Sequence, residues 1–251
     1  MGDEKENILR ELRKSGFPTE IKVTEYLKNK SERIMVAPNK CYWIYNNQQS
    51  YLDESKNKIR EIDLCAIVRH PHRISFSKDN KIIKLYIECK KSDKAKWVFY
   101  TKPPSILHFQ VLEVVRDILQ IGKMEKYNPF NDVPDAYKTI NPHIGLTYQI
   151  VFRDRDEFYT AQMQALKAIF YCEKNPPRKN EKTIIIPVVV FEGGMYRYDM
   201  TNKEPEIQKI RYLRYRSHGI PESPIPLYVD VVHIDFFPEY INLIEKEIIA
   251  L

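Results

Sequence analysis

A run of β-branched residues, Thr183 to Phe191, places the strongest constraint on how this chain can fold. The run reads TIIIPVVVF, and apolar residues of this density are typical of a strand buried on both faces. Such a strand belongs to a sheet that is covered by helices on both sides. The run therefore predicts an α/β domain.

The rest of the chain supplies further strands and helices for such a domain. Short apolar or alternating runs predict strands at Tyr42–Tyr51, Arg60–Arg69, Lys81–Lys91 and Leu227–Ile234. Apolar residues at helical spacing predict helices at 18–30, 106–119, 159–171 and 239–251. Glu192-Gly193-Gly194 predicts a turn after the buried run, and several prolines predict an irregular insertion at about 122–157. We see no repeat and no linker, so we expect one domain over 1–251.

The composition excludes several classes of protein. With 43% hydrophobic and 29% charged residues, the chain has an ordinary globular composition. Its apolar stretches are too short to span a bilayer, and the charged N-terminus leads into no apolar stretch, so we expect neither a membrane span nor a secretory signal. Four widely spaced cysteines form no C-x-x-C pair, which favours a reduced, intracellular protein. We expect a cytoplasmic location, without membrane contact. The 7 glycines form no phosphate-binding loop, which argues against a nucleotide-driven enzyme.

The positive charge is concentrated in one part of the chain. The net charge is +6, and residues 51–102 alone carry 13 Lys and Arg against 7 Asp and Glu. Residues 103–251 carry 18 against 20, so they are slightly acidic. A solvated surface explains many lysine-rich stretches, but a phosphate-backbone binder also needs a local positive field. The charge alone does not decide between these two interpretations.

Asp63, Glu88 and Lys90 form the constellation with the clearest chemical meaning. Glu88 and Lys90 share one face of the strand at 81–91, because alternate side chains of a strand point the same way. If the strands at 60–69 and 81–91 pair as a hairpin, Asp63 converges on Glu88. Two such carboxylates repel each other unless a cation joins them, and Mg²⁺ prefers one or two carboxylates together with phosphate. The alternative is a surface ion pair of Glu88 with Lys90, with Asp63 in a turn.

These residues and their order resemble the PD-(D/E)XK nuclease superfamily, which has the restriction-endonuclease-like fold. The resemblance covers about two thirds of the chain and uses Asp63, Glu88-Cys89-Lys90 and the first-helix residue Glu20. Ile62 stands where the family has a proline. The resemblance implies a core of helix, three-stranded meander, helix and strand at about 16–200, followed by a C-terminal extension with a helix at about 201–251. It also implies metal ligation by Asp63, Glu88, Glu20 and the carbonyl of Cys89.

The same resemblance implies a metal-dependent nuclease. We expect Mg²⁺ as cofactor, with Mn²⁺ as a substitute, and DNA as substrate, which would associate the protein with the nucleoid. Lys91, Lys94, Lys96 and Arg211 are the basic residues expected to hold phosphates. Trp97 is expected either to stack on a base or to lie in the core. Cutting both strands of a duplex needs two sites, so a homodimer is one expected arrangement.

Two other functions remain open at this stage. An inactive module of the same fold could bind nucleic acid or protein without turnover. An enzyme that acts on RNA or on nucleotides is the third alternative. The carboxylates and the lysine favour the nuclease, because a binding module has no need of an acidic pocket that faces phosphate.

Overall fold

The computed structural model describes residues 4, 6–7, 16–32, 41–69, 80–102, 144–152, 156–172, 181–199, 206–217 and 228–250. Over these residues the chain forms a mixed sheet of eight strands with three α-helices, which confirms the α/β class. None of the described helices has both the length and the apolar composition needed to cross a bilayer. The elements are α2 (Phe17–Glu32), β1 (Tyr42–Asp53), β2 (Lys58–Arg69), β3 (Asn80–Lys102), β4 (Ile144–Val151), α5 (Glu157–Cys172), β5 (Glu181–Asp199), β6 (Ile207–Lys209), β7 (Tyr212–Arg216), β8 (Tyr228–His233), the 3₁₀ turn η2 (Ile234–Phe236) and α6 (Phe237–Ala250).

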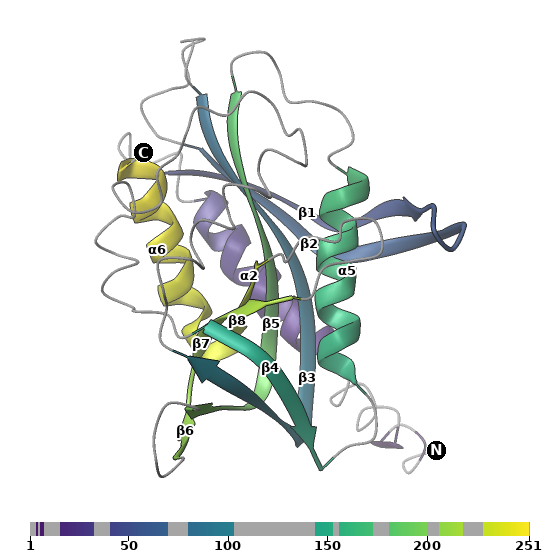
Figure 1. Ribbon diagram of the computed structural model, residues 1–251. Helices are drawn as coiled ribbons and strands as arrows, with labels where there is room; N and C mark the ends of the chain where they lie inside the picture. The colour runs from purple at the N-terminus through teal and green to yellow at the C-terminus, as the bar shows by residue number, and fades with distance from the viewer. Residues whose placement is uncertain are drawn as a thin grey trace.

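The two long strands β3 and β5 run parallel to each other and organise the sheet (Figure 1). On one side of β3, β2 and then β1 follow as antiparallel neighbours. On the far side of β5, β8 lies parallel to it. The C-terminal half of β3 continues beyond this core and pairs with β4, while the C-terminal half of β5 pairs with β6. The core of the sheet therefore has the strand order β1-β2-β3-β5-β8.

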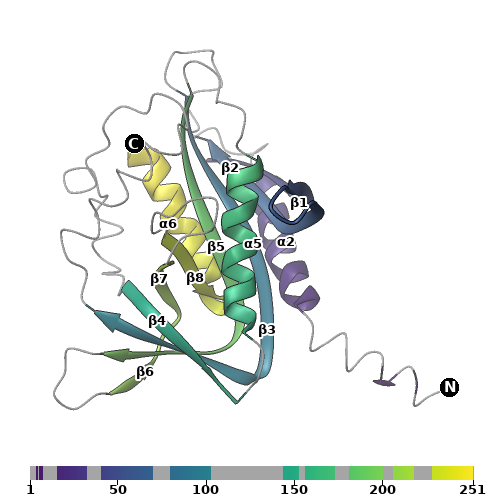
Figure 2. The ribbon, with the colours of Figure 1, turned by 45° about the vertical axis from the view of Figure 1, so that its right-hand side comes forward.

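Helices cover both faces of this core (Figures 1 and 2). α2 and α6 lie on one face, where Val23 and Ile241 belong to the same apolar cluster as Val188 of β5. α5 lies on the opposite face, where Leu166 packs with Val189, the next residue of β5. Burial of successive β5 residues on opposite faces explains why residues 184–191 of this strand are apolar without a polar residue at every second position.

The structure corrects two of the predicted boundaries. The turn expected at Glu192-Gly193-Gly194 is wrong, because β5 continues as a strand through these residues, with Glu192 opposite Lys91 and Gly194 opposite Lys96 of β3. The irregularity lies instead in β3, between Lys91 and Lys96. A Cβ on Gly193 would lie 2.6 Å from the carbonyl oxygen of Ser92, so glycine permits a close approach of the two strands here rather than a turn.

The expected insertion at 122–157 is also partly wrong. Residues 144–151 form β4, which pairs with β3, and α5 begins at Glu157. Residues 122–143, the expected helix at 106–119 and the connection at 70–79 lie outside the described residues. The other predicted helices and strands are confirmed, with ends that differ by a few residues, and β3 and β5 extend well beyond their predicted C-terminal ends.

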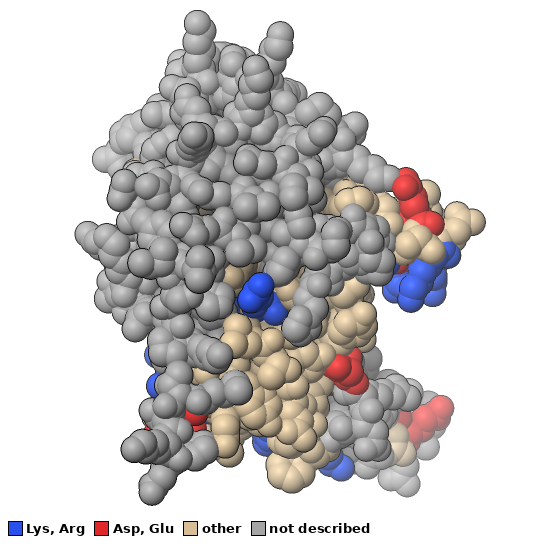
Figure 3. Space-filling view, in the orientation of Figure 1, with Lys and Arg blue, Asp and Glu red and all other residues tan. Residues whose placement is uncertain are grey.

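The ribbon formed by β1 and β2 extends beyond α5 (Figure 1). Its turn carries the exposed side chains of Glu54, Lys56 and Asn57, and Lys58 follows at the start of β2. Acidic and basic side chains therefore lie together at the outer end of the ribbon (Figure 3). This end has no dominant charge.

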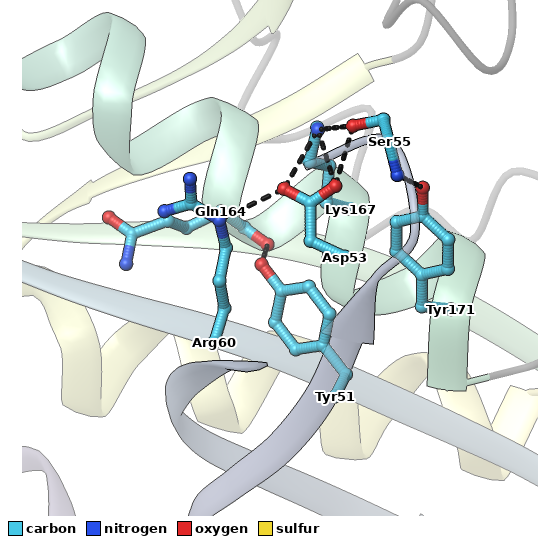
Figure 4. Close-up of polar contacts among 7 residues, drawn as sticks. All are labelled: Tyr51, Asp53, Ser55, Arg60, Gln164, Lys167 and Tyr171. Carbon is cyan, nitrogen blue, oxygen red and sulfur yellow. Dashed lines mark hydrogen bonds and ion pairs between the residues drawn. The ribbon is translucent and has the colours of Figure 1, made fainter. Parts of the chain in front are cut away.

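A buried ion pair ties the ribbon to α5 (Figure 4). Asp53 at the end of β1 is fully buried, and both of its carboxylate oxygens lie 3.0 Å from Nζ of Lys167 on α5. Arg60 and Ser55 also donate to this carboxylate, at 2.9 Å and 2.6 Å. Burial acts to raise the pKa of Asp53, but the donors outweigh it and lower the pKa to about 2. The ribbon is thus fixed to the helix by a charged, fully hydrogen-bonded carboxylate.

Candidate active site

Asp63 lies where β2 separates from β3. The backbone pairing of the two strands runs from Arg69 opposite Ile82 to Leu64 opposite Ile87 and stops there. Asp63, which precedes Leu64 in β2, lies just outside this pairing. Its side chain takes the place of a backbone acceptor, because its Oδ2 accepts a hydrogen bond of 2.7 Å from the backbone N–H of Cys89. The expected antiparallel pairing of these strands is therefore confirmed, and it brings Asp63 next to Glu88-Cys89-Lys90.

Glu88 and Lys90 form a close ion pair on the face of β3 that α5 covers. Nζ of Lys90 lies 2.6 Å from Oε1 of Glu88. The partners of these two residues on β5 are Val189 and Phe191, which belong to the apolar cluster on the α5 face. Glu88 is only 1% exposed, while the side chain of Lys90 keeps 24% of its exposure. Glu88 is therefore buried, whereas the side chain of Lys90 remains partly exposed.

The second oxygen of Glu88 has no such partner. Among the described residues, Oε2 of Glu88 is buried and accepts no hydrogen bond. An unsatisfied buried carboxylate oxygen is costly, and such groups in folded proteins usually serve an ion, a water or a ligand. Within the described parts of the chain, no donor offsets the burial of this oxygen.

Burial makes the acidic groups of the cluster harder to ionise, even with Lys90 beside them. Burial is the main cause that raises the pKa of Glu88, to about 7, and the neighbouring Asp63 adds to it while Lys90 opposes it. Burial also raises the pKa of Asp63, against the hydrogen bond from Cys89 and the charge of Lys90. For Lys90 burial lowers the pKa, but the charge of Glu88 outweighs it, so the net shift is upward. Lys90 therefore stays charged at neutral pH.

The N-terminus of α2 lies against the same residues. The carbonyl of Gly16 accepts hydrogen bonds of 3.0 Å from the N–H groups of Thr19 and Glu20 and so starts the helix. A Cβ on Gly16 would lie 2.7 Å from the carbonyl oxygen of Cys89, so only glycine allows α2 to begin this close to β3. That carbonyl, which the resemblance assigned to the metal, thus lies against Gly16.

Glu20 belongs to the cluster through its charge. Its side chain is partly buried, and no described hydrogen bond joins it to the other three residues. Burial raises the pKa of Glu20, the charge of Asp63 raises it further, and that of Lys90 lowers it. The structure therefore brings Glu20, Asp63, Glu88 and Lys90 into one electrostatic group.

Glu192 connects α2 to β3 beside this group, and nothing in the sequence indicated it. Its carboxylate accepts from Thr19 at 3.0 Å, from Lys22 at 2.9 Å and from Lys91 at 2.9 Å. Despite partial burial, these donors lower the pKa of Glu192 to about 2. Lys91, expected to hold phosphate, is thus occupied by this ion pair.

The other expected phosphate contacts lie at varying distances from the cluster. Lys94 is exposed, and Lys96 is partly buried with its Nζ 3.2 Å from the carbonyl of Asp93. Arg211 is exposed, with its guanidinium 5.1 Å above the ring of Phe236. Lys90 lies in the same row across the sheet, three strand spacings or roughly 14 Å from Arg211.

Trp97 lies in the core rather than at a nucleic-acid surface. It has no exposed area, and its ring is stacked on that of Phe191 with the centroids 3.7 Å apart. Trp97 therefore cannot stack on a base without unfolding this region, and the core alternative is confirmed.

The residues present fit a divalent cation held by two carboxylates. Within the described parts of the chain, no three His, Cys, Asp or Glu side chains converge into a ready-made metal cage. Mg²⁺ does not require such a cage, because it keeps several waters and binds through one or two carboxylates and substrate phosphates. Asp63 and Glu88 would supply those carboxylates, and Oε2 of Glu88 is an acceptor without a donor among the described residues.

Comparison with known proteins gives no independent assignment. No protein-family model, no curated protein and no solved structure matches the chain.

Proposed function

We propose that the protein is a metal-dependent nuclease that hydrolyses phosphodiester bonds in DNA, with a site like that of the PD-(D/E)XK superfamily. The observation that carries the proposal is the junction of β2 and β3, where Asp63 accepts from Cys89 beside the buried pair of Glu88 and Lys90. The order α2-β1-β2-β3-β4-α5-β5 supports it, because it contains the helix, three strands, helix and strand that the resemblance implies, with β4 added before α5.

Asp63 and Glu88 would hold the Mg²⁺ ion, with Glu20 as an outer carboxylate. When bound, such an ion polarises a phosphoryl oxygen and lowers the pKa of a bound water. Lys90 has a different task. Because its pKa is raised, it remains a cation at neutral pH, so it is suited to donate a hydrogen bond to the phosphoryl group and to neutralise the charge that develops there. Glu88 keeps Lys90 in position through the 2.6 Å contact.

The supporting residues fix the distance between α2 and β3. Glu192 joins Thr19 and Lys22 of α2 to Lys91 of β3, and Gly16 lets the helix approach the carbonyl of Cys89. Correct placement of a carboxylate within an ångström has large effects on rate in catalytic sites. These contacts hold the N-terminal turn of α2, which carries Glu20, against β3.

The test is a cleavage assay on supercoiled plasmid, single-stranded DNA and RNA, with Mg²⁺, with Mn²⁺ and with EDTA. Wild type is compared with Lys90→Met, which keeps the apolar stem, and with Lys246→Met, a matched change of an exposed lysine on α6. We expect metal-dependent cleavage by wild type and Lys246→Met and a loss of at least a hundredfold in Lys90→Met. Circular dichroism confirms that each variant is folded.

Three results would change the assignment. Equal cleavage by wild type and Lys90→Met would remove Lys90, and with it this site, from the reaction. A gel shift without cleavage would favour the nucleic-acid-binding module over the enzyme. Cleavage confined to RNA would keep the site but change the substrate.

A further inference from the structure

The pairing of β1 with β2 opens at one position, opposite Asp63. Asn47 pairs with Leu64 and Gln49 pairs with Ile62, but Gln48 and Asp63 between them form no pair. Gln48 has a φ of 52°, in the left-handed region that glycine adopts readily and glutamine rarely does. Strained backbone of this kind is concentrated at binding and catalytic sites. Here it occurs one strand away from the candidate active site.

The edge strand at this point carries a row of neutral amides. Asn46, Asn47 and Gln48 are exposed and Gln49 is partly exposed, and none of these four side chains has a hydrogen-bond partner in the described structure. β1 is the outermost of the described strands on this side of the sheet. Adjacent strands lie about 4.8 Å apart, so the Gln48 backbone is next to that of Asp63. A molecule held at Asp63 therefore lies within reach of the Gln48 side chain.

We propose that Gln48, assisted by Asn46, contacts base edges of the nucleic acid next to the phosphate held at Asp63, and so sets base preference around the cut. This inference rests on the proposed function. A carboxamide offers one acceptor and a donor group, which matches the edges of bases, and glutamine and asparagine pair in this way with adenine in particular. Charged groups such as Lys94 supply the electrostatic attraction to phosphates that a neutral amide lacks.

The charges at the outer end of the same ribbon, beyond the amide row, agree with this division. The outer end of the ribbon combines Glu54 with Lys56 and Lys58, so it offers no strong field for a phosphate backbone (Figure 3). A neutral side chain contributes little to the salt dependence of binding, because it releases no counterions. Removal of the Gln48 side chain should therefore change the sequence preference but not the slope of binding affinity against salt concentration (the salt slope).

Gln48→Gly is the most direct variant, because glycine removes the side chain and also relieves the backbone strain, so loss of folding does not obscure the result. Gln48→Asn keeps a carboxamide in a residue type that tolerates positive φ. Asn57→Gly is the matched control, since Asn57 has a φ of 46° in the ribbon turn, at a distance of roughly 17 Å along β1 from Gln48.

The assay sequences the cut sites in a library of random DNA and measures binding at several salt concentrations. We expect Gln48→Gly to cut less overall and to lose about tenfold in base preference at positions flanking the cut. Gln48→Asn should retain part of that preference, Asn57→Gly all of it, and none should change the salt slope. If wild type binds without cutting, the same comparison is made on sequences selected by binding.

The outcomes separate this inference from the proposed function. Unchanged preference in Gln48→Gly, with wild type active, would overturn the inference alone. A decrease of the salt slope by about one unit would overturn it too, because it would make Gln48 part of a phosphate contact. Absence of both cleavage and binding in wild type would overturn the proposed function and the inference together.

Discussion

Replacement of Lys167 by methionine gives the sharpest test of the packing described above. The change leaves the fully buried Asp53 carboxylate without the ammonium that lies 3.0 Å from each of its oxygens. Removing one partner of a buried ion pair typically costs about 3–5 kcal/mol, because the other charge remains buried. Arg60 and Ser55 still donate to Asp53, so we expect the lower end, about 3 kcal/mol. In a chain of this size this lowers the melting temperature by roughly 6–12 °C.

The measurement is urea denaturation followed by circular dichroism. Lys56→Met, an exposed lysine in the same ribbon turn, is the control and should stay within about 0.5 kcal/mol of wild type. The double variant Asp53→Leu/Lys167→Met should recover most of the loss, because an apolar pair of similar volume replaces a buried ion pair at little cost. A single variant within about 1 kcal/mol of wild type, or no recovery in the double variant, would refute the reasoning.

The ion pair of Asp53 and Lys167 also predicts how the free energy of unfolding changes at acid pH. The pKa of Asp53 is lowered from 3.8 to about 2, so the folded state binds fewer protons than the unfolded state between these values. The stabilisation is present above pH 3.8 and is lost as the pH falls through 2, with a total of about 2 kcal/mol. In Lys167→Met the pKa of Asp53 rises, so the loss should begin at a higher pH.

Three more predictions concern the candidate site. Gly16→Ala places a Cβ 2.7 Å from the Cys89 carbonyl oxygen and should cost about 1–3 kcal/mol by thermal denaturation; an unchanged melting temperature would contradict the tight contact of α2 with β3. Glu192→Gln should cost about 1 kcal/mol in urea through its weakened bond to Lys91, and a stabilised variant would contradict this. Burial raises the pKa of Glu88 to about 7, so the fraction of Glu88 in the carboxylate form increases as the pH rises through 7. Calorimetry should therefore find weaker Mg²⁺ binding at pH 6 than at pH 8. Equal affinity at the two pH values would contradict the assignment of Glu88 as a ligand.

The local sequence pattern was sufficient for most of the strands and for the approach of Asp63 to Glu88. Both depend on short-range signals, namely runs of apolar residues and the alternation of side chains along a strand. The same local reasoning was wrong at Gly193, because a Gly-Gly pair indicates a turn only when no neighbouring strand holds it extended. In the structure β3 provides that neighbour through its pairing with Glu192 and with Gly194, on either side of Gly193.

The supporting contacts could not be predicted, because they join residues that are distant in the sequence. Glu192 and Lys167 look like ordinary surface charges, since their partners are 173 and 114 residues away, at Thr19 and Asp53. The backbone conformation of Gln48 has no local signal either, because glutamine is not a residue that favours positive φ. These features depend on contacts between residues that are distant in the sequence, and local sequence patterns do not predict such contacts.

The bond from Thr19 to Glu192 also has a consequence for how the protein is made. The two residues are separated by 173 positions, so at about 5–20 residues per second a ribosome needs roughly 9–35 s to synthesise the chain between them. During this interval Thr19 and Lys22 of α2 have no Glu192 to bind. An incomplete chain therefore lacks this connection between the start of α2 and β3 until most of its length has been synthesised.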